Sequence, residues 1–401
     1  MSMEIWLWGA AAIGSVVGLG YLGNQVMFGR MKRNWRQLAN ALGLTFDPMR
    51  WRIHGEFDGL RIEVLRVGDG SWEAQARIRG KAPLALTIRP RSFTEPFTTP
   101  VWDPDFDQHF IVEGSPVRVL ALLSPGLRRA WLSEMVKRWT LDGDDEGWLL
   151  EADFSMELTS LLRPVVTEGL TLGRKVADAG RCFLAHPSST AFARALVERL
   201  SDPSPRIRAL VAQSLATYLR SEPEVAPALT LALNDPEPSV RLEAALVLDR
   251  ADVLVALARA ADSGTAIRRA AFSRAVELAP RDTATLAMVR AWALGDATEP
   301  RLEALAVLPK VTDELEPLLL EVLTVVERNP DDASLAVLFR MLETHGTASS
   351  VPRLLPYRDR FFDSRLKGLA RDAILAIQNR AGGSTGALSL TLQGGELSEP
   401  E

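Results

Sequence analysis

Cysteine is almost absent from this chain, since Cys182 is the only one in 401 residues. A single thiol cannot form an intramolecular disulfide, so a disulfide-stabilised fold is excluded and the composition suits a reducing compartment. A large excess of either charge is also missing, because the formal net charge is only −5 at pH 7. The chain therefore lacks the basic excess that is typical of general nucleic-acid binders.

Histidine is scarce too, and the four histidines (His54, His109, His186 and His345) are scattered along the chain. Cys182 and His186 are four residues apart, a spacing that would permit a thiol–base pair on one helix. We favour a core cysteine beside a solvated histidine, because buried cysteines are common and usually inert. We expect no enzymatic activity, no bound cofactor and no catalytic residues.

Only one long stretch lacks charge, and it lies near the N-terminus. Residues 5–29 contain no charged side chain. A helix of about 24 residues spans roughly 36 Å, which exceeds the roughly 30 Å of bilayer hydrocarbon. We predict a transmembrane anchor over residues 1–29 rather than a cleaved signal peptide, because Glu4 stands where a signal peptide carries basic residues.

Basic residues follow the apolar stretch, at Arg30, Lys32, Arg33 and Arg36. Such residues stay on the cytoplasmic side of a membrane, where anionic lipids attract them. We therefore expect a single-pass protein of the inner (cytoplasmic) membrane, in contact with its lipids through the N-terminal helix, with the bulk of the chain facing the cytoplasm.

Small residues recur every four positions within the expected anchor, at Ala10, Gly14 and Gly18. This spacing lets two transmembrane helices approach closely and is one basis for predicting a dimer. The alternative, which we favour, is that glycine and alanine are simply common in such helices.

Residues 30–180 show strand-like alternation between turn residues. Arg52 to Val67 is interpreted as two strands joined by the hairpin dipeptide Asp58-Gly59. Helices and strands do not alternate as βαβ units, so we predict an α+β domain with an antiparallel sheet. The other expected strands are at 72–79, 84–89, 110–112 and on both sides of 143–147, and the expected helices are at 34–44, 124–137 and 155–179.

The segment Asp103 to Gly114 (DPDFDQHFIVEG) resembles the Asp-Pro-x-Phe-Asp-x-x-Phe-x-Val signature of an uncharacterised bacterial domain. That domain often follows a membrane anchor. The helix expected at 34–44 and the later Leu-Ser-Pro-Gly-Leu-Arg fit it as well. The resemblance covers roughly residues 33–178 and implies no known activity.

Two acidic clusters in this domain raise the question of a metal. The alternating residues of the first are Asp103, Asp105, Asp107 and His109. Because Phe106 and Phe110 lie between them and are typical of core anchors, we interpret the acids as solvated and expect no metal. The second cluster, Asp142 to Asp153, has the spacing of a calcium loop but no glutamate at its last position. It also suits an acidic hairpin turn, and the sequence leaves calcium open there.

Internal repetition dominates residues 181–380. The motif Asp-Pro-x-Pro-x-Ile/Val-Arg begins at Asp202 and again at Asp235, an offset of 33 residues. A period in the thirties with two helices per unit is typical of a solenoid. The helix pairs that we expect are 189–220, 222–250, 251–279, 281–309, 313–345 and 348–380.

An aspartate followed by an arginine recurs as Asp202/Arg208, Asp235/Arg241, Asp262/Arg268 and Asp296/Arg301. We expect each aspartate to cap the helix that follows it, while the proline ends the helix before. The pattern resembles HEAT repeats, in which such residues form a ladder between adjacent units. The resemblance implies an all-α solenoid of HEAT-like helix pairs.

The sequence thus predicts a multidomain chain: a transmembrane anchor (1–29), an α+β domain (30–180), HEAT-like repeats (181–380) and a flexible tail (381–401). Solenoids usually act by binding partners, so we expect a membrane-anchored scaffold or adaptor for an unidentified protein and no nucleic acid. HEAT-like repeats also occur in lyases and in helical-repeat proteins that bind nucleic acid. A pocket of titratable residues would favour the lyase alternative, and a continuous basic groove the other.

Overall fold

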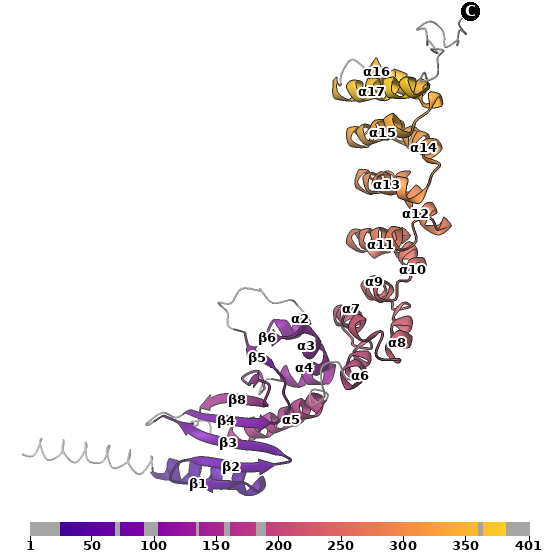
Figure 1. Ribbon diagram of the computed structural model, residues 1–401. Helices are drawn as coiled ribbons and strands as arrows, with labels where there is room; N and C mark the ends of the chain where they lie inside the picture. The colour runs from indigo at the N-terminus through magenta and orange to yellow at the C-terminus, as the bar shows by residue number, and fades with distance from the viewer. Residues whose placement is uncertain are drawn as a thin grey trace, which may run out of the picture. The chain divides into compact units, whose positions relative to one another are not determined.

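The computed structural model describes residues 25–68, 73–91, 103–133, 136–155, 161–181, 190–359 and 364–381 (Figure 1). The chain divides into two compact units, residues 1–232 and 233–401. The predicted dimer contact and nearly all of the predicted anchor lie outside the described residues, as does the tail beyond residue 381. Within the described part, no helix is both long and apolar enough to cross a bilayer.

Unit 1 contains an eight-stranded sheet in the order β1-β2-β3-β4-β8-β7-β5-β6, and its neighbouring strands are antiparallel as predicted. The β2–β3 hairpin turns at Asp58 and Gly59, whose φ angles of 51° and 77° are those of a tight hairpin turn. The strands are β1 (Thr45–Asp47), β2 (Arg52–Phe57), β3 (Leu60–Val67), β4 (Glu73–Gly80), β5 (Leu86–Pro90), β6 (Phe110–Gly114), β7 (Thr140–Gly143) and β8 (Trp148–Ser155).

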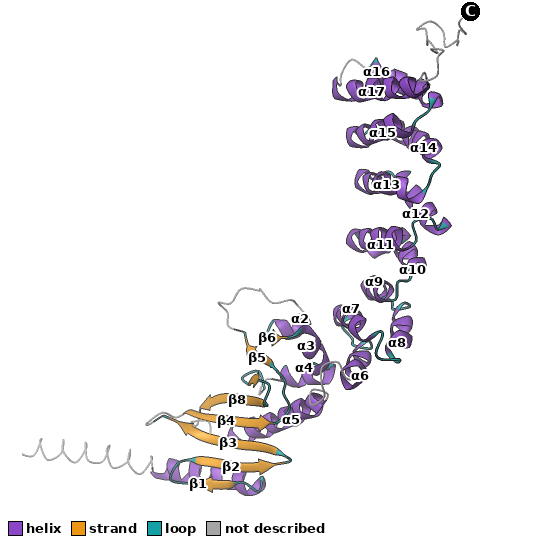
Figure 2. Cartoon of the chain, viewed as in Figure 1, coloured by secondary structure: helices purple, strands orange, loops and turns teal. Residues whose placement is uncertain are grey.

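The two faces of the sheet differ because successive side chains of a strand point to opposite sides. Apolar residues such as Leu60 and Ile78 face helix α5 (Leu162–Gly180), which lies along the sheet (Figure 2). Close approach requires glycine on α5: a Cβ at Gly169 would lie 2.1 Å from the ring of Trp139. The opposite face carries mainly charged and polar side chains.

Residues 25–41 form a helix that packs against the sheet through Trp35, whose ring lies 6.0 Å from that of Phe46 and 5.8 Å from that of Trp51. The basic residues that follow the predicted anchor in the sequence belong to this helix and are all exposed: Arg30, Lys32, Arg33 and Arg36. They are therefore accessible to solvent or to a charged surface.

Some of the remaining helices of unit 1 lie in the part of the chain, 181–380, that the sequence assigns to the repeats. Helix α3 was not expected, and α4 ends at Trp131 rather than near Lys137. Helix α3 packs on α6 and α7, which explains why the sheet and the first repeat helices form one compact unit. These helices are α2 (Pro104–Asp107), α3 (Pro116–Leu122), α4 (Pro125–Trp131), α6 (Thr190–Arg199), α7 (Pro205–Ser214), η2 (Leu215–Tyr218) and α8 (Val225–Ala232).

Unit 2 is all-helical, as the repeats predict. Helices α9, α11, α13, α15 and α17 stack in one layer, and α10, α12, α14 and α16 form the second (Figure 1). Buried alanines such as Ala244 and Ala275 allow the helices to approach closely. The helices are α9 (Pro238–Val247), α10 (Ala251–Arg259), η3 (Ala261–Ser263), α11 (Thr265–Leu278), α12 (Thr283–Ala293), α13 (Thr298–Val311), α14 (Leu315–Arg328), α15 (Asp332–His345), η4 (Ala348–Ser350), α16 (Val351–Arg358) and α17 (Ser364–Ala381).

Candidate functional site: the arginine–aspartate ladder

Asp202 and Asp235 organise the same turn in successive repeats. Asp202 Oδ1 accepts a hydrogen bond from the main-chain N–H of Ser204 at 3.0 Å, and Asp235 Oδ1 accepts one from Glu237 at 2.9 Å. Ser204 and Glu237 hold the N-cap positions of α7 and α9 without a side-chain cap. Contrary to the sequence prediction, the aspartates therefore fix the turn before each helix rather than cap its first turn.

The arginines of these two repeats bind the main chain of their own turns. Arg208 Nη1 donates to the carbonyl oxygens of Asp202 and Pro203 at 2.9 and 3.3 Å. Arg241 Nη1 reaches the equivalent carbonyls, six and five residues back, at 2.8 and 2.9 Å. The two copies of the motif have the same spacing. In each copy this spacing brings the arginine side chain to the carbonyl oxygens of the turn that precedes its helix.

The third predicted pair does not form. Asp262 is exposed, and no hydrogen bond or ion pair joins it to Arg268 in the described residues. Arg268 Nε instead donates to the carbonyl oxygen of Ala258 at 3.2 Å, and its guanidinium lies 5.6 Å from the ring centre of Trp292. This arginine is held by main chain and an aromatic face.

Arg301 is buried, with 1% of its surface exposed, and it binds an acid that the sequence did not indicate. Its Nη2 donates to the carbonyl of Gly295 at 2.7 Å, again six residues back, while its Nη1 forms an ion pair with Asp331. Asp331 also caps α15, since its Oδ1 accepts from Ser334 N at 2.7 Å. The predicted partner, Asp296, is exposed and makes no contact with Arg301 that the described residues show.

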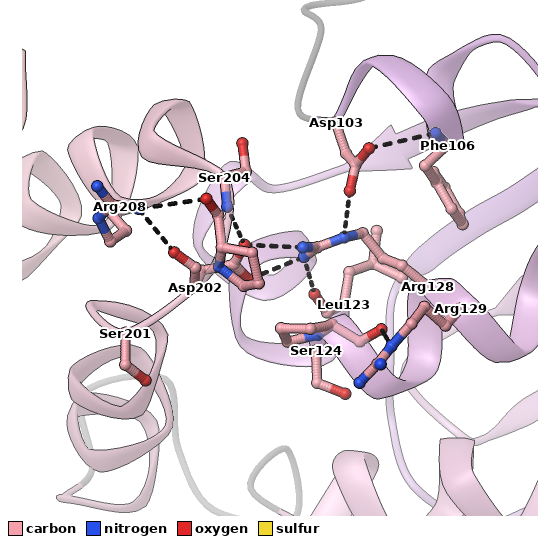
Figure 3. A network of polar contacts seen from close by, with 12 residues as sticks. Asp103, Phe106, Leu123, Ser124, Arg128, Arg129, Ser201, Asp202, Ser204 and Arg208 are labelled. Atoms are coloured by element: carbon pink, nitrogen blue, oxygen red, sulfur yellow. Dashed lines mark hydrogen bonds and ion pairs between the residues drawn. The ribbon is translucent and has the colours of Figure 1, made fainter. Parts of the chain in front are cut away.

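Arg128 makes the corresponding contact in unit 1, where it is 3% exposed on α4 (Figure 3). Its Nη1 and Nη2 donate to the two carboxylate oxygens of Asp202 at 3.0 and 2.8 Å, and its Nη1 also reaches the Leu123 carbonyl at 2.7 Å. The Asp202 side chain is fully buried. Such a bidentate ion pair is strong and directional. The arginine that binds Asp202 comes from the sheet domain, whereas in a ladder of repeats it would come from the preceding repeat.

Asp103 completes this network and accounts for the first acidic cluster. Its Oδ2 accepts from Arg128 Nε at 2.8 Å, and its Oδ1 accepts from the main chain of Asp105 and Phe106 at the start of α2. Phe106 and Phe110 are buried and stack with ring centres 4.9 Å apart, as expected of core anchors. The first acidic cluster therefore caps the start of α2 and supplies a carboxylate to Arg128.

The second acidic cluster lies on the β7–β8 hairpin. Hydrogen bonds from the main-chain N–H groups of Glu146 and Gly147 to Asp144 Oδ1, each 2.8 Å long, lower the pKa of the Asp144 carboxyl. Asp142 and Asp153 instead accept from side chains of neighbouring strands. No three potential metal ligands gather anywhere in the described residues, and the geometry is that of an acidic turn.

Exposed ion pairs connect successive repeats within each layer of unit 2. Arg290 on α12 binds Glu321 on α14 at 2.7 Å, and Arg353 on α16 binds Glu327 on α14 at 2.6 Å. In the other layer, Arg269 on α11 pairs with Glu303 on α13. Acidic partners therefore neutralise several surface arginines of the repeats.

Glu316 at the start of α14 binds the turn between α15 and α16. Its Oε1 accepts from Thr347 N at 2.9 Å, Thr347 Oγ1 at 3.0 Å and Ser349 Oγ at 2.9 Å, and also from Ser350 Oγ. Desolvation raises the pKa of Glu316, but these hydrogen bonds together outweigh it and leave the pKa below its ordinary value. The contact joins helices of adjacent repeats.

The predicted thiol–base alternative, Cys182 with His186, lies outside the described residues. Residues 193–277 match a family model described as HEAT repeats, which covers the Asp202 and Asp235 motifs and Arg268. No curated protein matches the chain. The similarity to HEAT repeats therefore lies within the helical half of the chain, from α6 to α11.

Proposed function

We propose that this protein is a membrane-anchored scaffold or adaptor that binds a protein partner through its HEAT-repeat solenoid. The observation that carries the proposal is the stack of helix pairs, in which ion pairs and Glu316 bridge one repeat to the next. Each repeat buries its apolar residues against its neighbours, so the outer helix faces remain as an extended surface for a partner.

One stripe of that surface suits a partner with acidic and apolar side chains. On α17, Lys367, Arg371 and Leu375 are exposed at successive four-residue intervals and share one face of the helix. Leu375 is 44% exposed, which is unusual for a leucine in this part of the chain. We place the partner contact on this stripe.

The membrane part of the proposal is supported by the uncharged run 5–29 and by the four exposed basic residues that follow it. A tether would restrict the search for the partner to the membrane and raise its effective concentration. A fusion of alkaline phosphatase to the C-terminus should then be inactive, whereas a fluorescent protein there should fluoresce. Active phosphatase, or release of the chain by carbonate, would contradict the anchored topology.

The partner should be identified by crosslinking in native membranes followed by mass spectrometry. A chain that lacks residues 1–24 should bind this partner with unchanged affinity and yet fail to restore function in a null strain. Leu375→Glu should weaken binding, whereas Met49→Glu, a control at another exposed apolar residue, should not. Full function of the untethered chain, or equal loss with both variants, would refute the proposal.

A further inference from the structure

The polar face of the sheet in unit 1 contains a hollow of about 550 Å³ over strands β2, β3 and β4. Arginine is in surplus there: the hollow is lined by Arg52, Arg61, Arg77 and Arg79, against Glu56 and Glu63. His54 also lines it. None of the residues that line this hollow belongs to the repeat ladder or to the α17 stripe, so neither of them accounts for its charge.

Two of the four arginines are already neutralised. Arg52 Nε lies 2.6 Å from a carboxylate oxygen of Glu63, and Arg77 Nε lies 2.8 Å from one of Glu151 on β8. These pairs follow the ordinary rule for exposed sheet faces, on which opposite charges on adjacent strands stabilise each other.

Arg61 and Arg79 break that rule. They are direct cross-strand partners on β3 and β4, so their Cβ atoms lie about 4.5–5.5 Å apart. Both are exposed, and neither forms an ion pair or hydrogen bond with any residue that the structure describes. Glu56 is opposite Arg61 on its other side but does not pair with it. Two like charges in direct opposition destabilise a sheet, which points to a use for them.

We propose that Arg61 and Arg79 bind the phosphate group of a small phosphate-bearing molecule. Guanidinium groups present a planar fork of donors that matches phosphate oxygens. A phosphate monoester carries a charge of about −1.5 to −2 at pH 7 and so neutralises two unpaired guanidinium groups. A ligand with a single carboxylate would leave one of the two guanidinium charges unneutralised. The volume of the hollow lies within the range of about 300–1,000 Å³ that is usual for small-molecule sites.

Glu56 sets the affinity of this site. Its carboxylate lies across the β2–β3 pair from Arg61 and repels an incoming anion. Glu56→Gln should therefore strengthen phosphate binding. A gain in affinity on loss of a carboxylate is expected of an anion site and is not expected of a surface that is only polar.

Calorimetric titration of the full-length protein with inorganic phosphate, at constant ionic strength, tests the assignment. Binding should saturate and exceed that of acetate, and Arg61→Gln and Arg79→Gln should each weaken it by about tenfold or more, as expected on loss of a charge-assisted contact. Arg50→Gln is the matched control, because Arg50 is exposed in the β1–β2 turn and does not line the hollow. Equal weakening by Arg50→Gln, or no preference over acetate, would overturn the proposal.

Thermal unfolding supplies a second readout. Without phosphate, Arg79→Gln should melt at or above the wild-type temperature because a like-charge contact is removed, and phosphate should raise the melting temperature of the wild type alone. A lower melting temperature of the phosphate-free variant would mean that the arginines are structural. Binding to phosphatidylglycerol vesicles that depends on Arg79 would assign the phosphate to lipid and overturn the small-molecule source.

Discussion

Arg128 and Arg301 lie in different compact units and bind in the same way, whereas Arg208 and Arg241 are related by the repeated sequence motif and by the way they hold their own turns. The first two are buried, and each contacts an aspartate carboxylate and a main-chain carbonyl. The second two are half-buried and donate to carbonyls of their own turns. A buried guanidinium needs a neutralising carboxylate because desolvation is costly. Burial therefore explains why Arg128 and Arg301 each have a carboxylate beside the guanidinium.

The largest effect is expected for Arg128→Met, which leaves the buried carboxylate of Asp202 without its cation. Removal of one partner of a buried ion pair costs about 3–5 kcal/mol. Nine of the ten tryptophans lie before residue 150, so denaturant unfolding followed by tryptophan fluorescence reports mainly on unit 1.

Arg129→Met is the matched control for that variant, since it removes a hydrogen bond to the carbonyl of Pro125 at the neighbouring, exposed position of α4. Its cost should be about 1 kcal/mol. The double variant Arg128→Met/Asp202→Asn should recover part of the loss, because the uncompensated buried charge is gone. Equal costs for Arg128→Met and Arg129→Met would contradict the role given to burial.

A smaller effect is expected for Asp235→Ala. The variant loses the hydrogen bond to Glu237 N, but the main-chain carbonyl that Arg241 binds remains. We expect a loss of about 1 kcal/mol, measured as faster amide hydrogen exchange in α9. Unchanged exchange in α9 would show that this turn does not depend on the Asp235 carboxylate.

Glu316 should make the stability of unit 2 depend on pH. Its pKa is lowered in the folded state, so its contribution is present above the ordinary value of 4.5 and is lost as the pH falls through the folded pKa. Glu316→Gln should therefore exchange amide hydrogens faster than the wild type around Thr347 at pH 7. The two proteins should converge only as the pH falls through the folded pKa, which lies below 4.5. A difference that persists once the carboxyl is protonated in both states would argue against an ionised carboxylate.

The smallest effect is expected at Glu243 on α9. Burial raises the pKa of this carboxyl, and no hydrogen bond or ion pair within the described residues offsets that cost. Because the folded pKa is raised, stability falls as the pH rises from the ordinary value of 4.5 through the folded pKa. Glu243→Gln should thus melt slightly higher than the wild type at pH 7 and equally at pH 4. Destabilisation at pH 7 would show that the carboxylate has a partner.

Much of the fold could be predicted from local signals in the sequence. Asp58-Gly59 specified the β2–β3 hairpin, and the Asp-Pro motifs at Asp202 and Asp235 marked the repeat period, because turn chemistry depends on neighbouring residues. Each helix pair expected from 189 to 380 contains two α-helices. The helical fold was therefore accessible without any knowledge of long-range contacts.

The ladder contacts could not be predicted in the same way. Arg128 and Asp202 are 74 residues apart, and nothing in their spacing distinguishes Arg128 from Arg129 beside it. Asp331 was not predicted because it lies 30 residues after Arg301, whereas Asp296 lies five residues before it, close to the interval of six in the other pairs. Such contacts depend on which side chains packing removes from water, and that is fixed only when the helices assemble.

The position of Asp202 at the junction has a consequence for the length of the solenoid. A deletion of residues 203–235 would join Asp202 to Pro236 and restore an Asp-Pro-x-Pro-x-Val-Arg motif, because the two copies are 33 residues apart. The acid that receives Arg128 would stay in place while one whole repeat was removed. Insertion of one period at the same point would preserve it equally. Repeat number and the Arg128–Asp202 ion pair are thus separable properties of this chain, so the length of the solenoid can be altered with that contact kept, provided that α9 takes the place of α7 against α3.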